Sequence, residues 1–338
     1  MFQLQVCDAF FYAVKDHATR DDWAMKKEEA GIRNGWFAPE YVEQALNQWV
    51  QALQPEHATA WVQNYKWPEK PVEKTLGLIL AGNIPVVGFH DILCGLSCGY
   101  QLRVKLSSDD EVLLKFWFDE ACKYMPELAN RLGFSENMKG IDVAIATGSN
   151  NSSRYFEYYF RHIPHLLRKN RNSAAILTGT ESEAELQSIG RDVFDYFGLG
   201  CRNVTHLRLP EGYAFKLLFD AWQIYAGHIN HHKYAGNYEY HKAILLMNLD
   251  PHLDNGFLLM KEKPEIYSPV GMLNYSYYND SQENVDWMQQ HAEELQCVVG
   301  IAEMEGVIRP GKAQQPGLSD YADGKDVVAW LLSLQHTT

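Results

Sequence analysis

The sequence predicts an α/β fold with a mainly parallel β-sheet, and three observations lead to this fold class. Segments typical of strands alternate with segments typical of helices over residues 72–198, an order that favours parallel strands joined by right-handed crossovers. The first strand, Thr75–Leu80, is almost continuously apolar, as in a strand covered on both faces. After Arg208 the pattern changes, and further helices and strands indicate a second α/β unit.

The first 66 residues have helical patterns and form an expected packing layer. Pro39 stands at a predicted helix start, because proline is tolerated in the first turn. One apolar face follows at helical spacing and consists of Val42, Leu46, Trp49 and Val50. The segment 67–71, with prolines at 68 and 71, ends this layer.

The expected strands of the first unit are Thr75–Leu80, Gln101–Leu106, Ile141–Ala146 and Ser173–Leu177. Helices are expected at Val86–Gly99 and after two capping-box patterns, Ser108 with Glu111 and Ser182 with Glu185. The second unit is expected to contain helices near Phe215–Ile229, Tyr238–Met247 and Val285–Leu295, and strands at Gly256–Lys261, Met272–Tyr278 and Cys297–Ile301. We place the domain boundary between residues 197 and 198.

The composition argues against some classes of binding partner for this protein. The net charge of −13 and the pI near 5.4 leave no basic excess of the kind that binds nucleic acid or an anionic membrane surface. No apolar stretch approaches the length of a membrane span, and the N-terminus lacks a basic segment followed by an apolar run. We therefore expect a cytoplasmic protein. Its six cysteines are far apart, which favours reduced thiols.

Cys201 is the candidate nucleophile. It stands in the turn 198–205, after a helix that is expected to end at Gly198. Glycine leaves little side-chain bulk around the sulfur, so a substrate carbonyl could approach it. A buried structural thiol is the alternative, since free cysteine is among the most buried residue types.

The turn Thr147-Gly148-Ser149 carries a predicted strand into a helix. Such a turn could hold a phosphate with backbone N–H groups, a hydroxyl and the positive end of the helix dipole. A turn that binds nothing is the alternative. The sequence has no G-x-G-x-x-G after a strand, so the standard dinucleotide fingerprint is missing.

Two clusters of metal-ligand residue types are not interpreted as metal sites. His90, Cys94 and Cys98 could share one face of an apolar helix, but they lack a fourth nearby ligand. The segment 228–241, which reads HINHHKYAGNYEYH, is better explained as a polar surface or as a segment on the substrate side. We expect its glycine and asparagine to break any regular helix.

Five short motifs occur in the order found in the aldehyde dehydrogenase superfamily. They are Asn83-Ile84-Pro85-Val86, Lys105-Leu106-Ser107-Ser108, Thr147-Gly148-Ser149, Cys201 and Glu265-Ile266-Tyr267-Ser268-Pro269-Val270. The chain most closely resembles the acyl-CoA reductase branch, which includes the fatty-acid reductase of bacterial bioluminescence. The resemblance implies an aldehyde-dehydrogenase-like α/β fold, with N-terminal helices and an NAD(P)-binding parallel-sheet domain in residues 1–197 and an α/β catalytic domain in residues 198–338.

The resemblance also implies roles for single residues. It makes Cys201 the thiolate that accepts an acyl group and Asn83 a donor to the oxyanion that forms when sulfur attacks a thioester. Taken alone, Asn83 before a proline would be a turn residue. Lys105 matches the lysine that holds the adenosine ribose of the cofactor, and Glu265 matches the glutamate that binds the nicotinamide ribose. A solvated lysine and an exposed loop carboxylate are the alternatives.

The remaining cofactor residues implied by the resemblance are Ser108, Gly148 and Ser149. Relatives that prefer NAD often have a carboxylate where this chain has Ser108. A neutral hydroxyl leaves room for a 2′-phosphate, which a carboxylate would repel. The sequence therefore favours NADPH, with NADH as the alternative.

Residues 167–173 lack the glutamate that activates the hydrolytic water in relatives that oxidise aldehydes. Loss of that base suits exchange of the acyl group with coenzyme A. The stretch is basic, and we hypothesise that Arg168, Lys169 or Arg171 contacts a phosphate of coenzyme A or NADPH, a solvated turn being the alternative.

The expected function is thus NAD(P)H-dependent reduction of an acyl-CoA thioester to the aldehyde through a thioacyl cysteine. Three alternatives are a reductase of acyl phosphate, a reductase of an acyl-carrier-protein thioester, and an inactive nucleotide-binding homologue. Relatives associate through an arm, and this sequence contains no evident arm. The oligomeric state is therefore left open, with a homo-oligomer as one alternative.

Overall fold

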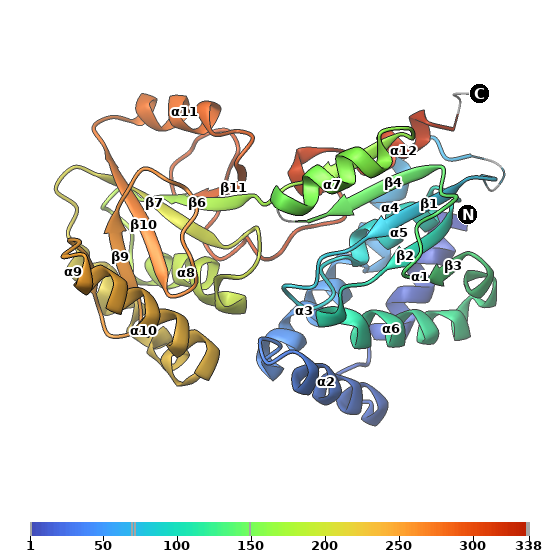
Figure 1. Cartoon of the computed structure of the whole chain (residues 1–338), viewed down its shortest axis with the longest axis horizontal. Helices are drawn as coiled ribbons and strands as arrows, with labels where there is room; N and C mark the ends of the chain where they lie inside the picture. The colour runs from blue at the N-terminus through green and yellow to red at the C-terminus, as the bar shows by residue number, and fades with distance from the viewer. Residues whose placement is uncertain (1, 69, 71, 149, 336–338) are drawn as a thin grey trace. The chain divides into compact units, whose positions relative to one another are not determined.

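The computed structural model describes residues 2–68, 70, 72–148 and 150–335. The chain forms two compact units, one made of Met1–Asn170 and Pro316–Thr338 and the other of Arg171–Gln315 (Figure 1). The units divide elsewhere than at the predicted boundary after residue 197. The reason is that the expected fourth strand, β6 (Asn172–Ile176), lies in the sheet of the second unit.

The first unit contains a parallel sheet, as predicted. Its five strands lie in the order β3-β2-β1-β4-β5. They are β1 (Thr75–Ile79), β2 (Gln101–Lys105), β3 (Leu132–Phe134), β4 (Val143–Thr147) and β5 (His165–Arg168). Ile79 of β1 lies opposite Lys105 of β2 and Ala146 of β4, so the carboxyl ends of these strands are level. The predicted α/β class is confirmed.

Helices cover both faces of this sheet. α7 (Asn150–Phe160) lies on one face, and α5 (Phe89–Ser97) and α6 (Glu111–Tyr124) lie on the other (Figure 1). α1 (Phe2–Val14) packs onto both α5 and α6, as expected of an N-terminal packing layer. The rest of this layer is α2 (Asp21–Arg33), α3 (Pro39–Ala52) and α4 (Pro55–Gln63), and the C-terminal α12 (Val327–Ser333) also contacts α5.

Aromatic rings join the helical layer to the helices on the sheet. Phe89 of α5 stacks on Trp117 of α6 with ring centroids 3.8 Å apart, and Phe10 of α1 meets Phe89 edge-on at 4.9 Å. The indole N–H of Trp117 also donates to the carbonyl of Phe10 over 3.0 Å. These rings are fully buried, so they fix α5 and with it the turn that precedes α5.

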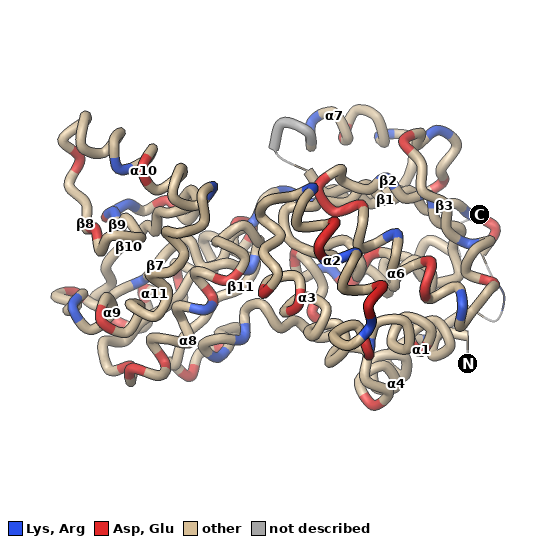
Figure 2. Tube along the Cα trace, turned by 90° about the horizontal axis from the view of Figure 1, so that it is seen from below, with Lys and Arg blue, Asp and Glu red and all other residues tan. Residues whose placement is uncertain are grey.

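Both signs of charge occur on α2, in short blocks that follow one another along the helix (Figure 2). Asp21 and Asp22 occupy its first turn and Arg33 its last turn, which complements the helix dipole. Lys26 pairs with Glu29 one turn further along at 2.7 Å. Because such a pair is exposed, it contributes only about 0.3–0.5 kcal/mol.

Two predicted helix starts in this unit had different outcomes. Pro39 is the first residue of α3, as predicted. The predicted capping box of Ser108 and Glu111 is wrong. A 3₁₀ turn, η1 (Ser108–Asp110), precedes α6, and the capping residue is Ser107, one residue earlier than predicted. The hydroxyl of Ser107 accepts the N–H of Asp109 at 3.3 Å, and α6 itself begins at Glu111.

The second unit has a seven-stranded sheet in the order β12-β11-β6-β7-β10-β9-β8. The strands not yet given are β7 (Val204–Pro210), β8 (Leu253–Asp254), β9 (Leu259–Glu262), β10 (Met272–Tyr278), β11 (Leu295–Gly300) and β12 (Val307–Ile308). Only the short pairing of β8 with β9 is antiparallel among the described strands. α8 (Glu183–Phe194) and α9 (Phe215–Trp222) cover one face, and α11 (Ser281–Gln290) packs on the other.

Two helices of this unit test the sequence analysis. The capping box of Ser182 and Glu185 is confirmed at the start of α8. The expectation that glycine and asparagine break the histidine-rich segment is wrong, because α10 (His232–Met247) runs through them. Buried tyrosines hold it in place: the hydroxyl of Tyr234 donates to the carbonyl of Phe257 over 3.0 Å, and that of Tyr238 donates to Asp254 over 2.7 Å. Within the described part of the chain, no helix combines the length and apolar character that crossing a bilayer requires.

Candidate active site

The carboxyl edge of the sheet in the first unit is where this fold places a ligand. From β1 the chain proceeds to β2 and β3 on one side, and it later returns to β4 and β5 on the other. Ligands of open α/β sheets bind at such a reversal of strand order, outside the carboxyl ends of the strands. Asn83 follows β1 and Gly148 follows β4, so these two predicted residues flank the reversal.

The Asn83 turn is exposed at its tip and tightly packed at its base. The side chain of Asn83 is exposed, whereas Gly82 and Val86 are buried. A Cβ on Gly82 would lie 2.6 Å from the Cβ of Ser107, so only glycine lets the turn lie directly on η1. Val86 has φ 52°, a left-handed conformation that is strained for a β-branched residue.

A buried acid lies beneath this turn. Asp110, the last residue of η1, is 2 % exposed, and burial raises the pKa of its carboxyl well above the ordinary range. The backbone N–H groups of Val86 and Val87 oppose that shift. The carboxyl of Asp110 therefore lies against the strained part of the Asn83 turn, at Val86 and Val87.

The other predicted residues of the first unit lie along the same edge. Lys105 is the last residue of β2, and its ammonium lies 2.8 Å from the carboxylate of Glu136. Ser108 is exposed in η1. The N–H of Gly148 donates to the carbonyl of Arg168 over 3.3 Å, so this donor extends the β4–β5 pairing. Ser149 lies outside the described residues.

Arg168 does not serve as a phosphate ligand, and that part of the hypothesis is wrong. Its guanidinium is buried and forms a two-pronged ion pair with Asp91 of α5, with N–O distances of 2.5 and 2.7 Å. Arg171 donates to the carbonyls of Ala292 and Leu295 over 3.0 and 2.9 Å, and so holds the turn between α11 and β11 and the first residue of β11. Lys169 is exposed.

In the second unit, Cys201 occupies a braced turn between η3 (Asp195–Gly198) and β7. Its thiol forms no disulfide and the residue is half-buried. Asn203, which is completely buried, accepts the N–H of Gly200 over 2.8 Å. The same side chain donates to the carbonyls of Asp195 and Asp192 over 2.7 and 3.1 Å, so it joins the cysteine turn to the end of α8.

The chain reverses sharply just before this turn. Tyr196, Phe197 and Gly198 all have positive φ angles, of 54°, 56° and 78°. Two consecutive non-glycine residues in this region are strained, and surrounding packing must hold them. His231 provides part of it, since its ring stacks on Phe197 with centroids 4.2 Å apart. The histidine-rich segment thus supports the approach to Cys201.

Ser173 and Cys297 lie beside the cysteine turn. The hydroxyl of Ser173, a buried residue of β6, donates to the carbonyl of Cys201 over 3.0 Å. The same oxygen lies 3.1 Å from the sulfur of Cys297 and accepts the N–H of Cys297 over 3.3 Å. Because Ser173, Cys201 and Cys297 come from segments distant in sequence, no local pattern indicated this arrangement.

The structure also brings the Glu265 loop to β7. The carboxylate of Glu265 is exposed and lies 3.1 Å from the ammonium of Lys263; its own backbone N–H and then Lys263 lower its pKa. Thr205 donates to the carbonyl of Ile266 over 2.8 Å, and Asn274 donates to that of Glu265 over 2.9 Å. Cys201 and Glu265 are thus both placed near the amino end of β7.

The two histidine-containing clusters that were not interpreted as metal sites make structural contacts. The Nε2 of His90 lies 3.0 Å from the carbonyl of Leu318, and its ring stacks on Tyr321. The two ring nitrogens of His228 lie 2.9 and 3.2 Å from the carbonyls of Tyr225 and Phe194. Among the residues that the structure describes, no three His, Cys, Asp or Glu side chains are grouped to hold a metal ion.

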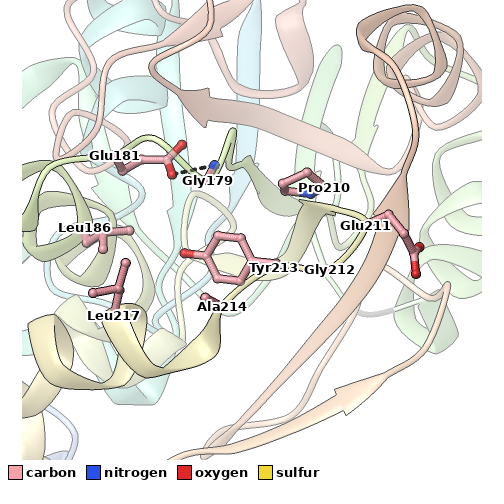
Figure 3. Close-up of a pocket in the computed structure, with 9 residues that line it drawn as sticks. All are labelled: Gly179, Glu181, Leu186, Pro210, Glu211, Gly212, Tyr213, Ala214 and Leu217. Atoms are coloured by element: carbon pink, nitrogen blue, oxygen red, sulfur yellow. Dashed lines mark hydrogen bonds between the residues drawn. The ribbon is translucent and has the colours of Figure 1, made fainter.

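A pocket of about 220 Å³ in the second unit lies away from these residues (Figure 3). Its lining follows the carboxyl ends of β6 and β7, whereas Cys201 precedes β7. Glu181 in this lining accepts the N–H groups of Thr178 and Gly179 over 2.5 and 2.9 Å. The oxygens of Glu181 are thus already engaged by their own loop.

Comparison with known proteins identifies the fold. The chain matches 98% of its length with aldehyde dehydrogenase 21 of Physcomitrella patens, solved with the reaction product succinate, at a TM-score of 0.69 and 11% identity over 84% of that chain. It matches a Mycobacterium tuberculosis aldehyde dehydrogenase complexed with NAD⁺ at a TM-score of 0.64 and 14% identity, over 90% of this chain and 74% of that one. No protein-family model and no curated protein sequence matches the chain. The predicted aldehyde-dehydrogenase-like fold is therefore confirmed.

Proposed function

We propose that this protein reduces an acyl-CoA thioester to the aldehyde with NADPH, or alternatively NADH, through a thioacyl intermediate on Cys201. The observation that carries the proposal is the braced cysteine turn in a chain with the aldehyde dehydrogenase fold. Asn203 fixes the turn to α8, and the glycine at 200 places no side chain next to the cysteine along the chain. Such a turn suits a nucleophile that must meet its substrate in a fixed geometry.

The residues of the first unit fit a nicotinamide dinucleotide. Lys105 lies at the carboxyl end of β2, and its partner Glu136 is 82% exposed. An exposed ion pair contributes little, so the ammonium can exchange Glu136 for the hydroxyls of a ribose. Ser108 is an exposed hydroxyl next to this edge, which suits a 2′-phosphate and supports NADPH. Glu265 would bind the nicotinamide ribose, and Gly148 with Ser149 would border the phosphates.

The chemistry begins at Cys201. Its thiolate forms a bond to the thioester carbon and coenzyme A leaves as its thiolate, which then takes up a proton. The negative charge that builds on the carbonyl oxygen is received by the side-chain amide of Asn83 and the backbone N–H of Cys201. When bound, the cofactor supplies a hydride to the acyl carbon. Cys201 then departs as thiolate and the aldehyde is released.

The segment 167–173 supports reduction rather than hydrolysis. A hydrolytic aldehyde dehydrogenase needs a carboxylate that activates water, and this stretch contains none. The nearby carboxylate of Asp91 is engaged by both terminal nitrogens of Arg168. Without an activated water, the thioacyl group persists until hydride or coenzyme A reaches it.

Intact-mass analysis of the full chain tests the proposal directly. Incubation with acyl-CoAs of graded length, without cofactor, should add one acyl group on Cys201, and adding NADPH should remove it as aldehyde. Cys201→Ala should take no acyl group and should oxidise no NADPH, whereas Cys122→Ala, a half-buried cysteine of α6, should behave as the parent. Turnover by Cys201→Ala would refute the assignment.

The same assay separates the alternatives. Faster labelling by an acyl phosphate or an acyl-carrier thioester than by acyl-CoA would reassign the acyl donor while keeping Cys201. Binding of NADPH without any labelling would indicate an inactive nucleotide-binding homologue.

A further inference from the structure

Cys297 is a second thiol next to the candidate nucleophile, and the reductase mechanism does not use it. One oxygen, the hydroxyl of Ser173, contacts both segments: it lies 3.0 Å from the carbonyl of Cys201 and 3.1 Å from the sulfur of Cys297. All three residues belong to the second unit. The hydroxyl of Ser173 therefore links the backbone of Cys201 to the sulfur of Cys297.

Irregular strand pairing produces this arrangement. The register of β6 with β7 shifts between Ser173 and Ala174, and that of β11 with β6 shifts between Leu295 and Val298. Cys297 lies within the second irregularity, outside the regular ladder. Such bulges re-aim side chains and are frequent next to active sites. Here the N–H and the sulfur of Cys297 both meet the hydroxyl of Ser173, which faces the cysteine turn.

The surroundings of Cys297 disfavour the ionised form of its thiol. Burial raises its pKa, and the bond to Ser173 and the charge of Arg202 oppose that rise. A charge on Cys201 raises the pKa of Cys297 further. The net result is a raised pKa, so Cys297 ionises less readily than an ordinary thiol.

We propose that Cys297 is a resolving thiol that traps Cys201 as a disulfide when a peroxide oxidises it. This inference rests on the proposed function only in taking Cys201 as the reactive thiol. The thiolate of Cys201 attacks one oxygen of hydrogen peroxide, the O–O bond breaks, and Cys201 becomes a sulfenic acid while the departing hydroxide takes up a proton from solvent to form water. The sulfur of Cys297 then attacks the sulfur of Cys201. An S–S bond forms, and the hydroxide of the sulfenic acid leaves with the proton of Cys297 as a second water.

Disulfide formation requires the backbone near Cys201 to shift. Glycines at positions 198 and 200 precede Cys201, and Gly198 has φ 78°. Because glycine adopts more backbone conformations than other residues, these are the positions at which the braced turn can rearrange. The disulfide blocks acylation and protects Cys201 from the irreversible sulfinic state, and a thiol reductant restores it.

The test treats the full chain with hydrogen peroxide and follows it by intact mass and peptide mapping. The parent should lose two hydrogens and yield a Cys201–Cys297 linked peptide, and dithiothreitol should restore both the mass and iodoacetamide labelling of Cys201. Cys297→Ser should instead accumulate two oxygens on Cys201, and dithiothreitol should not reverse it. Cys122→Ser is the matched control and should behave as the parent.

Two results would overturn the inference. One is sulfinic acid on Cys201 in the parent at the rate seen in Cys297→Ser, and the other is a parent that yields no linked peptide. Cys297→Ala provides a second variant if Cys297→Ser does not fold. Because the linked peptide is detected by mass, a chain that forms it but reduces no acyl-CoA refutes the proposed function and leaves the thiol pair standing.

Discussion

Replacing Asn203 by alanine should both destabilise the protein and release the Cys201 turn. The buried amide joins the N–H of Gly200 to carbonyls of Asp192, Val193 and Asp195 at the end of α8. Its removal leaves a buried donor and at least one buried acceptor without partners, and each such group costs about 1–3 kcal/mol. We therefore expect the free energy of unfolding to fall by about 3–5 kcal/mol.

Urea unfolding measures this loss, and iodoacetamide labelling of Cys201 under native conditions measures the freedom of the turn. Asn237→Ala is the matched control, because Asn237 is half-buried and makes one bond, to the carbonyl of Lys233 within α10. It should change the unfolding free energy by less than about 1 kcal/mol and leave labelling unaltered. If Asn203→Ala unfolds at the urea concentration of the control and labels at the parent rate, the bracing argument is refuted.

Three further substitutions probe the site and its supports. Asn83→Ala should lower the rate of aldehyde formation by about 10²- to 10³-fold with little change in KM, since it removes an oxyanion donor; an unchanged kcat would remove that role. Asp192 has a pKa raised by burial to about 7, from an ordinary value of 3.8. Between these values the folded chain binds more protons than the unfolded chain, so the unfolding free energy should fall by up to about 4 kcal/mol as pH rises from about 4 to about 7. Urea unfolding of Asp192→Asn should lack this slope, and a slope as steep as that of the parent would contradict it. Arg168→Ala leaves the carboxylate of Asp91 buried and unpaired, and should cost about 3–5 kcal/mol in urea unfolding; a stable variant with a raised KM for acyl-CoA would restore the phosphate hypothesis.

Buried apolar runs were the most predictable part of the fold. β1 ends within one residue of its prediction, because a continuous apolar run is typical of a strand covered on both faces, and β10 matches its prediction at Met272–Tyr278. The sheet to which β6 belongs was not predictable, since only residues 169–171 separate it from β5 and no pattern marks the change of sheet. The second part of α10 matches the helix predicted near Tyr238–Met247, but its first part was missed for a related reason: Tyr234 anchors it to the carbonyl of Phe257, further along the chain.

The residues of the candidate site also fall into two groups, those with a local sequence signal and those without one. Cys201, Asn83 and Glu265 could be proposed from the sequence because each lies in a motif that can be recognised locally. Asn203 is next but one to Cys201, and a buried asparagine after a glycine turn is a signal that could have been used. Ser173 and Cys297 gave no such signal, because strand bulges bring them together from opposite ends of the second unit.

The aromatic stack of Phe10, Phe89 and Trp117 gives the first 66 residues a purpose that their lack of motifs conceals. A fragment trimmed to the recognisable motifs would begin near residue 70 and would present Phe89 and Trp117 to water. Such a fragment would aggregate and fold poorly, and α5 could no longer fix the position of the Asn83 turn. The smallest functional fragment of this protein therefore includes the N-terminal helical layer, which a search for motifs alone would discard.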